Sequence, residues 1–170
     1  LGTTKVKEPG RMQSAIHEAF DEADEVIIER FVPGIEVTCG CYQTAEKEIV
    51  FPLTEVVTDN DFFDYGAKYN GEVQEITPAR IPDEVADSIR KETLRIYDLV
   101  GAKGVIRVDF IIPSDGKPVM LEINTTPGMT STSFIPQQVR AAGLNMTDVT
   151  TEIIENELKQ ITKRGFEQSL

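Results

Sequence analysis

The sequence has no tryptophan, one histidine (His17) and two cysteines (Cys39 and Cys41). The two cysteines are one residue apart, so they form neither a C-x-x-C pair nor the framework of a small disulfide-rich secreted domain. They fall in a strand-like run, where both side chains point the same way, and we expect them to be small buried residues. His17 lies in a predicted helix, and no Ser-His-Asp or Cys-His arrangement can be assembled around it.

Basic residues are also scarce, with 17 Lys and Arg against 29 Asp and Glu, and a net charge of -12. This balance argues against nucleic acid as the main partner. No apolar run is long enough to span a membrane, and no signal peptide is recognisable, so we expect a cytoplasmic protein without a membrane partner. The sequence starts at Leu1 without a Met, and we expect that a natural N-terminal part is missing.

Apolar periodicity predicts the main helices and strands of the chain. Helices are expected over 11–23, 83–100, 134–142 and 147–163. Strands are expected over 26–31, 35–43 and 48–57, and the last two form a hairpin around 44–47. The last helix should turn inward the residues Val149, Ile153, Ile154, Leu158 and Ile161.

Residues 58–80 show no sustained period and mix Asp, Asn and Gly with aromatic residues. Long irregular stretches in compact domains are uncommon and often act as lids. With a hairpin predicted within 105–124, the element order indicates an α+β fold in which helices cover an antiparallel sheet. The alternation of a dinucleotide-binding fold is absent, and so are its glycine motif and the Walker sequence.

Residues 105–133 hold most of the functional information. They comprise two strand-like runs joined by a turn and followed by a Pro-Gly loop. Because alternate side chains point to opposite faces of a strand, Arg107 shares a face with Asp109, and Glu122 shares a face with Asn124. A hairpin of these two runs would gather two carboxylates and an amide beside one guanidinium group.

Carboxylates within apolar strands are costly to bury unless they are paired or bind metal. Hard oxygen ligands of this kind suit Mg²⁺, which keeps positions open for phosphate oxygens and water. We therefore expect a site for Mg²⁺ and a nucleotide. The alternative is a structural network in which Arg107 pairs the carboxylates; Asn124 and the Pro-Gly loop favour the metal site.

Five further segments stand in chain order at 1–6 (LGTTKV), 29–36 (ERFVPGIE), 63–69 (FDYGAKY), 107–109 (RVD) and 122–130 (EINTTPGMT). They resemble the end of the glycine-rich phosphate loop, the adenine-binding hinge, the mobile loop, the Arg-x-Asp motif and the metal-binding motif of the D-alanine–D-alanine ligases. That family belongs to the ATP-grasp enzymes and makes a dipeptide for the bacterial cell wall. The resemblance implies an ATP-grasp C-terminal domain over 33–170, with a mobile loop at about 58–80, and a remnant of the central subdomain over 1–32.

The resemblance also implies roles for the residues around the predicted hairpin. Asp109, Glu122 and Asn124 would bind two Mg²⁺ (or Mn²⁺) ions, with Glu122 bridging them. Arg107 and the backbone N–H of Gly128 would hold the acyl phosphate and the oxyanion of the tetrahedral intermediate. A plain turn at Gly128 would serve folding equally well, and the sequence does not separate these two readings.

Substrate contacts are implied for the loops. Lys68 would reach the γ-phosphate of ATP, Tyr69 would lie near the second D-alanine, and Ser133 would hydrogen-bond the carboxylate of that D-alanine. The alternatives are solvated or surface-packed loop side chains for Lys68 and Tyr69, and a helix N-cap for Ser133.

Nucleotide contacts are implied for the hinge. Its backbone groups would meet adenine at Glu29, Arg30, Phe31 and Val32, and Glu36 would bind the ribose hydroxyls. Arg30 replaces a Lys that is common in the family, which matters little where the backbone makes the contact. For Glu36 an exposed strand charge is the alternative.

The activity that the resemblance implies is ATP-dependent ligation of two D-alanine molecules through D-alanyl phosphate, for peptidoglycan synthesis, by a protein that forms a homodimer at full length. The 170 residues alone are expected to be inactive. Two alternatives stay open. One is a related ligase with D-lactate or D-serine as acceptor, although the resemblance implies that Tyr69 favours an amine and so disfavours D-lactate. The other is a non-catalytic nucleotide-binding module.

Overall fold

The computed structural model describes residues 2–58 and 73–167. The chain divides into two compact units, the first made of Leu1–Pro33 with Thr58–Gln74 and the second of Gly34–Val57 with Glu75–Leu170. Within the described part, no helix is both long enough and apolar enough to cross a membrane.

The first unit contains a short 3-10 helix, Pro9–Arg11, followed by α1, Met12–Phe20. The strand predicted over 26–31 is wrong, because these residues have no regular secondary structure. A β-strand needs a hydrogen-bonded neighbour, and no described strand pairs with this segment. Its apolar side chains are accordingly exposed, Ile27 to 84% and Ile28 to 63%.

The second unit is built on an antiparallel sheet with the strand order β4-β3-β1-β5-β6, and β2 pairs with the same edge of β1 as β3 does. The strands are β1 Ile35–Gln43, β2 Glu48–Val50, β3 Thr54–Thr58, β4 Val73–Ile76, β5 Ile106–Ile112 and β6 Val119–Asn124. β1 and β5 pair over seven residues, from Ile35 opposite Ile112 to Cys41 opposite Ile106.

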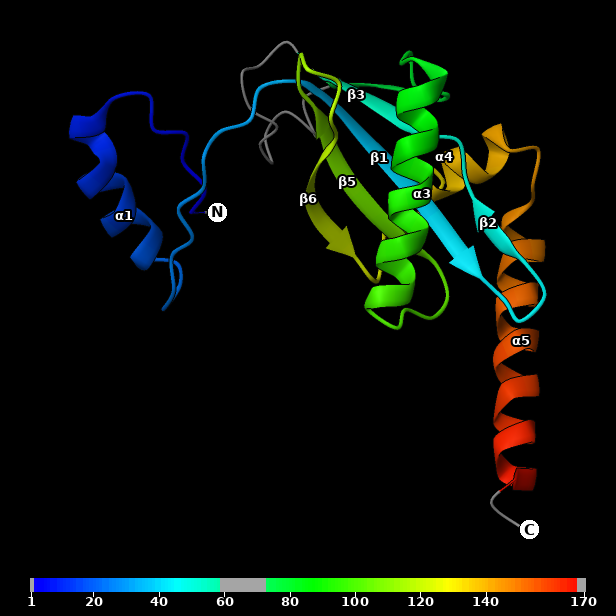
Figure 1. Cartoon of the computed structure of the whole chain (residues 1–170). Helices are drawn as coiled ribbons and strands as arrows, with labels where there is room; N and C mark the ends of the chain where they lie inside the picture. The colour runs from blue at the N-terminus through cyan, green and yellow to red at the C-terminus, as the bar shows by residue number, and fades with distance from the viewer. Residues whose placement is uncertain (1, 59–72, 168–170) are drawn as a thin grey trace. The chain divides into compact units, whose positions relative to one another are not determined.

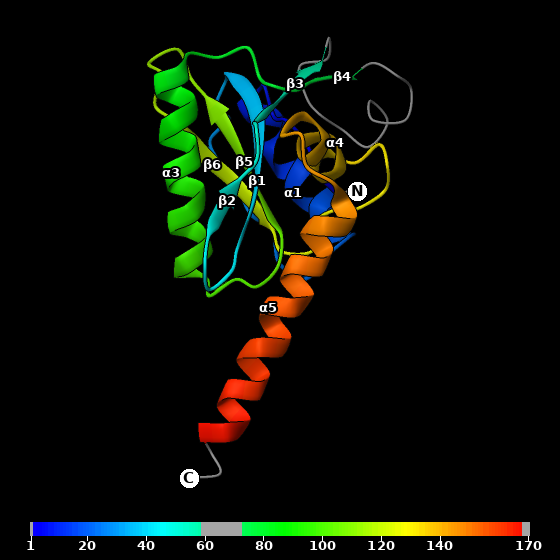
Figure 2. The ribbon, with the colours of Figure 1, turned by 90° about the vertical axis from the view of Figure 1, so that its right-hand side faces the viewer.

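Three helices cover this sheet from its two sides, and they are α3 Asp83–Leu99, α4 Phe134–Ala141 and α5 Met146–Glu167. Figure 2 shows α3 on one side of the sheet and α4 with α5 on the other. Alternation along β1 explains the division, since Val37, Cys39 and Cys41 pack in one core cluster with α3. Tyr42 points to the opposite face and packs in a second cluster with α4 and α5.

The predicted α+β fold with helices on an antiparallel sheet is therefore confirmed. Both cysteines are fully buried, as expected. Burial raises the pKa of the Cys39 thiol to about 12 and also raises that of Cys41. These thiols belong to the core on the α3 face.

Two predicted boundaries need correction. The strand expected over 48–57 is broken at residues 51–53 into β2 and β3. Phe51 and Leu53 turn into the core at this break, at 0% and 2% exposure. The irregular stretch expected over 58–80 contains the strand β4 at its C-terminal side. Residues 59–72 of that stretch lie outside the described residues.

The helix predicted over 147–163 exists as α5, but its apolar stripe is only partly buried. Val149 is 2% exposed and Ile153 packs at the margin of the second cluster, as expected. Ile154, Leu158 and Ile161 are 54%, 58% and 64% exposed, so their predicted inward placement is wrong. α5 runs beyond the end of the sheet (Figure 1). At about 100° per residue, these three positions lie roughly 120° to 180° around the helix from Val149, so they face away from the second cluster.

Candidate active site

The register of three neighbouring strands places the predicted cluster on one face of the sheet. Asp109 of β5 lies opposite Glu122 of β6, and Arg107 lies opposite Asn124. On the other side of β5, Asp109 lies opposite Thr38 of β1. Directly opposed residues point to the same face of a sheet, so all five side chains emerge together, away from α3. The predicted gathering of two carboxylates, an amide and a guanidinium is thus what the fold contains, at Arg107, Asp109, Glu122 and Asn124, and Thr38 joins them from β1.

Arg107 and Asp109 form the tightest contact of the cluster. The guanidinium donates from Nε to Oδ1 of Asp109 at 2.9 Å and from its terminal nitrogen to Oδ2 at 2.7 Å. Both side chains are largely buried, at 16% and 13% exposure. Two parallel charge-assisted bonds of this kind fix the orientation of the guanidinium as well as its position.

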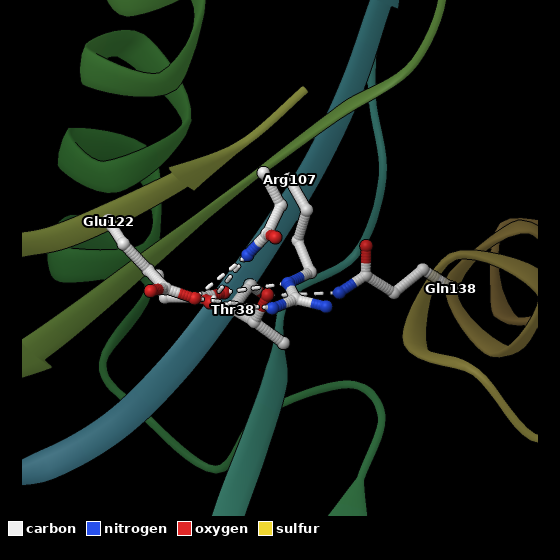
Figure 3. Close-up of polar contacts among 6 residues, drawn as sticks. Thr38, Arg107, Glu122 and Gln138 are labelled. Carbon is white, nitrogen blue, oxygen red and sulfur yellow. Dashed lines mark hydrogen bonds and ion pairs between the residues drawn. The ribbon is translucent and has the colours of Figure 1, made fainter. Parts of the chain in front are cut away.

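Glu122 and Asn124 are held more loosely. The Asn124 amide donates to Glu122 at 2.9 Å and to Asp109 at 3.5 Å, while Arg107 lies 3.8 Å from Glu122 (Figure 3). The Glu122 side chain is 64% exposed. A purely structural ion network would bury and satisfy both carboxylates, whereas this one leaves the Glu122 oxygens open to solvent and to a ligand.

Glu36 of β1 lies on the same face as this cluster. Burial raises the pKa of its carboxyl above the ordinary value; the charge of Asp109 adds to the rise, Arg107 opposes it and Glu122 adds a smaller rise. Three carboxylates thus share one electrostatic environment with one guanidinium group. Such a surplus of negative charge favours the binding of a cation.

The Pro-Gly loop brings two further predicted residues together. A side chain at Gly128 would come within 2.8 Å of the Ser133 hydroxyl, and that hydroxyl shares a hydrogen bond of 2.7 Å with Thr130. Gly128 does not have a positive φ. A Cβ at position 128 would push away the Ser133 hydroxyl, the end of an exposed side chain, so glycine here permits the close approach of backbone and hydroxyl. Ser133 does occupy the N-cap position of α4, yet its side chain makes no capping hydrogen bond.

The remaining predicted residues lie in other parts of the chain. The hinge residues Glu29, Arg30, Phe31 and Val32 belong to the first unit and have no regular secondary structure. The Phe31 ring carries the Lys5 ammonium 3.6 Å from its centroid. Lys68 and Tyr69 lie outside the described residues.

Sequence reasoning missed three residues of this face. Thr38 is 2% exposed, and its hydroxyl finds no hydrogen-bond partner among the residues that the structure describes. The Phe134 ring lies 5.1 Å from the Arg107 guanidinium carbon. Gln138 is fully buried behind Thr38. Two signals were present in the sequence: alternation from Glu36 predicts Thr38 on its face, and Gln138 interrupts the apolar stripe of its helix.

The donor set fits a magnesium ion that takes part of its shell from elsewhere. Within the described ranges, no three His, Cys, Asp or Glu side chains form a group able to hold a metal. The cluster offers two carboxylates and one amide oxygen, the kind of partial oxygen shell that Mg²⁺ completes with phosphate and water. Asn124 would present its Oδ1 after a turn of its amide plane.

The family model described as "D-ala D-ala ligase C-terminus" matches residues 1–155. D-alanine–D-alanine ligase of Parabacteroides distasonis is 69% identical over 159 residues, which cover 94% of this chain and 48% of that protein. The ligase of Bacteroides fragilis is 62% identical over 156 residues, covering 92% and 48%. The chain thus spans about half the length of these curated relatives.

Two solved structures extend the likeness to the fold. VanG D-Ala:D-Ser ligase from Enterococcus faecalis superposes with a TM-score of 0.78 at 34% identity, over 91% of this chain and 45% of that one. D-alanine–D-alanine ligase from Bacillus anthracis complexed with ATP gives a TM-score of 0.74 at 30% identity, over 94% and 51%. With the family model matched over most of its length, the chain belongs to the D-alanine–D-alanine ligase C-terminal family.

Proposed function

We propose that the protein carrying this chain joins two D-alanine molecules at the expense of ATP, through D-alanyl phosphate, to make a precursor of peptidoglycan. One observation carries the proposal: four side chains converge on the face of the sheet away from α3, namely Arg107, Asp109, Glu122 and Asn124. The proposal is supported by the 69% identity to the D-alanine–D-alanine ligase of Parabacteroides distasonis. We also propose that the protein acts in the cytoplasm, where ATP is available.

We propose that Asp109, Glu122 and Asn124 would hold Mg²⁺. A metal there would neutralise phosphate oxygens that the carboxylates alone would repel. Binding of nucleotide is supported by the ATP complex of the related Bacillus anthracis enzyme. Glu36 is proposed to meet the ribose, and the backbone from Glu29 to Val32 to meet adenine.

The chain's own residues supply positioning and charge. Arg107 is held by Asp109 with its guanidinium oriented before substrate arrives, so charge that develops on a nearby oxygen is stabilised without reorganisation. The Gly128 backbone lies next to the Ser133 hydroxyl, and the pair is proposed to receive an oxyanion and a substrate carboxylate. From the sequence alone, Lys68 is proposed to reach the γ-phosphate of ATP and Tyr69 to lie near the second D-alanine.

A second function has one specific observation in its favour. The structural relative VanG is named a D-Ala:D-Ser ligase, at 34% identity. D-Serine is an amine like D-alanine, so both suit the same acceptor chemistry, whereas D-lactate requires a hydroxyl nucleophile. The predicted Tyr69 favours an amine acceptor, and the curated relatives at 62–69% identity are named for D-alanine.

The test is product analysis with the protein expressed from its complete gene. Incubation with ATP, Mg²⁺ and equal amounts of D-alanine, D-serine and D-lactate should yield mainly D-alanyl-D-alanine, with one phosphate released per dipeptide. Predominant D-Ala-D-Ser or D-Ala-D-lactate would refute D-alanine as the preferred acceptor. ATP hydrolysis without any ligated product would refute the ligase activity.

Two further proposals accompany this activity. Residues 1–170 alone should form no dipeptide, because they match only 48% of the length of the related ligases; synthesis by this piece would contradict that. The full-length protein is proposed to be a homodimer, which a measurement of its mass in solution decides.

A further inference from the structure

The outer edge of β1 changes partner beside the candidate active site. β1 pairs with β3 as far as Thr38, opposite Thr54, and with β2 from Cys41 onward. Between these points the side-chain amide of Gln138, from α4, bonds the β1 backbone beside the Phe51 N–H, which donates to the Gly40 carbonyl at 2.9 Å. Its Oε1 accepts the Gly40 N–H at 2.9 Å, and its Nε2 donates to the Thr38 carbonyl at 3.0 Å.

The same amide also reaches β3, because its Nε2 donates to the Thr54 hydroxyl at 3.1 Å. Gln138 is 0% exposed. A buried primary amide with one acceptor and two donor contacts is nearly satisfied, so it holds α4, β1 and β3 in a single arrangement. Figure 3 shows Gln138 reaching from α4 toward Thr38.

Gly40 makes this close contact possible. A side chain there would lie 2.7 Å from Gln138 Oε1 and would also collide with Ile135, the second residue of α4. The first turns of α4 therefore pack against β1 more closely than any other residue at position 40 would permit. In this way the helix is locked to the strand at one point.

That point lies next to Arg107. Gly40 is the direct partner of Arg107 across the β1–β5 ladder. Phe134 is the first residue of α4, one helical turn before Gln138 and on the same side of the helix. Its ring lies 5.1 Å from the Arg107 guanidinium carbon, within the range of a cation–π contact.

We propose that Gln138 is a positioning residue for the ligation reaction. By locking α4 to β1 it sets Phe134 against the Arg107 guanidinium and sets Ser133, the residue before α4, beside Gly128. Asp109 accepts two hydrogen bonds from the guanidinium, and the Phe134 ring lies against it. The hydrogen bonds of Gln138 therefore determine where this cation lies relative to the Pro-Gly loop that holds Gly128. The proposal rests on the proposed ligase function.

The experiment compares four variants of the full-length protein, expressed from its complete gene, by steady-state kinetics and thermal unfolding. Gln138→Met removes all three hydrogen bonds at similar volume. Phe134→Leu removes the ring but keeps an apolar residue. The third is the double variant. Thr93→Val is the matched control, because Thr93 is equally buried, hydrogen-bonds the Ile89 carbonyl at 2.8 Å and lies in α3, on the other side of the sheet.

Gln138→Met should lower kcat and raise the KM for acceptor D-alanine, each about tenfold, because small displacements of positioned groups cost much rate. The KM for ATP should stay within about twofold, since the hinge is not touched. Phe134→Leu should give the same split, and the double variant should lose less than the product of the two single losses. Thr93→Val should lower the melting temperature without changing these constants.

Other outcomes overturn the proposal. If Gln138 serves stability alone, Gln138→Met and Thr93→Val will have the same kinetic constants, and that result would refute positioning. Independent, multiplying effects of Gln138→Met and Phe134→Leu would refute the route through Arg107. Should Gln138→Met not fold, Gln138→Glu takes its place, because it keeps the acceptor for the Gly40 N–H and removes the donor to the Thr38 carbonyl. The same change in kcat and in the KM for acceptor D-alanine, with an unchanged KM for ATP, is then expected. A wild-type protein that makes no dipeptide refutes the proposed function itself, before any variant is compared.

Discussion

Glu122 is the member of the active-site cluster whose side chain contributes least to the fold. It is 64% exposed, accepts one hydrogen bond from Asn124 and lies 3.8 Å from Arg107. Its carboxylate adds to the negative charge of this face, and the Arg107 guanidinium offsets that charge only in part. At the scale of a single residue, its carboxylate is therefore better explained by a ligand than by stability.

The substitution Glu122→Gln in the full-length protein should reduce dipeptide synthesis by at least about a hundredfold, because a metal ligand contributes several kcal/mol to charge stabilisation. Its melting temperature should change little. Asp115→Asn is the matched control, since Asp115 lies in the turn of the same hairpin and bonds only the Lys117 N–H among its described contacts. Near-normal turnover of Glu122→Gln would show that Glu122 binds no metal.

Glu55 illustrates the opposite case, a carboxylate that serves the fold. It is 8% exposed, and Arg80 donates to its two oxygens from Nε and a terminal nitrogen, both at 2.9 Å. These bonds hold the pKa of the Glu55 carboxyl below its ordinary value. A lowered pKa means that the contribution to stability is complete above the unfolded-state pKa and is lost as the pH falls through the folded-state value.

Glu55→Gln should therefore lower the free energy of unfolding at pH 7 and have a smaller effect at pH 3, as measured by urea denaturation at both values. Asp87→Asn provides the comparison, because Asp87 pairs with Arg90 at 2.6 Å on the exposed surface of α3. An equal loss for Glu55→Gln at both pH values would contradict the assignment to the ion pair.

At the scale of elements, α5 shows how far periodicity reaches. The spacing of apolar residues correctly predicts the helix, but not the depth at which each residue lies. Val149 packs in the second core cluster, whereas Leu158, nine residues later and so about half a turn around the helix, is 58% exposed. The apolar residues of α5 thus lie on two sides of the helix, and which side meets the core is decided by the tertiary structure.

Val149→Ala should cost about 2 kcal/mol of unfolding free energy, from the transfer of its methyl groups and the cavity they leave. Leu158→Ala, a larger truncation on the same helix, should change it by less than about 0.5 kcal/mol. Chemical denaturation of both variants checks this difference. A larger loss for Leu158→Ala would mean that the outer part of α5 packs against something beyond the described contacts.

The β5–β6 hairpin was the element best predicted from the sequence. Alternation alone places Arg107 with Asp109 and Glu122 with Asn124. The ladder register adds that the two pairs lie opposite each other on neighbouring strands and on the same face of the sheet. What alternation does not supply is the partner on the other side of β5. Thr38 joins the site through the β1 ladder, about seventy residues away in sequence, and Gln138 through a helix packed on that strand. Long-range packing of this kind leaves only weak local traces.

At the scale of the whole molecule, the two units differ in how well the sequence predicted them. In the second unit, most elements and the layer order follow from local patterns. The segment 26–31 of the first unit has the composition of a strand, yet the described residues offer it no partner. Strand propensity states what a segment suits, and pairing needs a second strand.

We propose that this face of the sheet binds the metal ions of an ATP-dependent ligase. Mn²⁺ can replace Mg²⁺ on oxygen ligands and scatters X-rays anomalously, so crystals of the full-length protein grown with Mn²⁺ and a non-hydrolysable ATP analogue report the site directly. We predict anomalous peaks about 2.1 Å from oxygens of Asp109, Glu122 and Asn124, with Glu122 shared between two ions. Nucleotide bound with Mn²⁺ on other residues, while these three side chains stay without metal, would contradict the account.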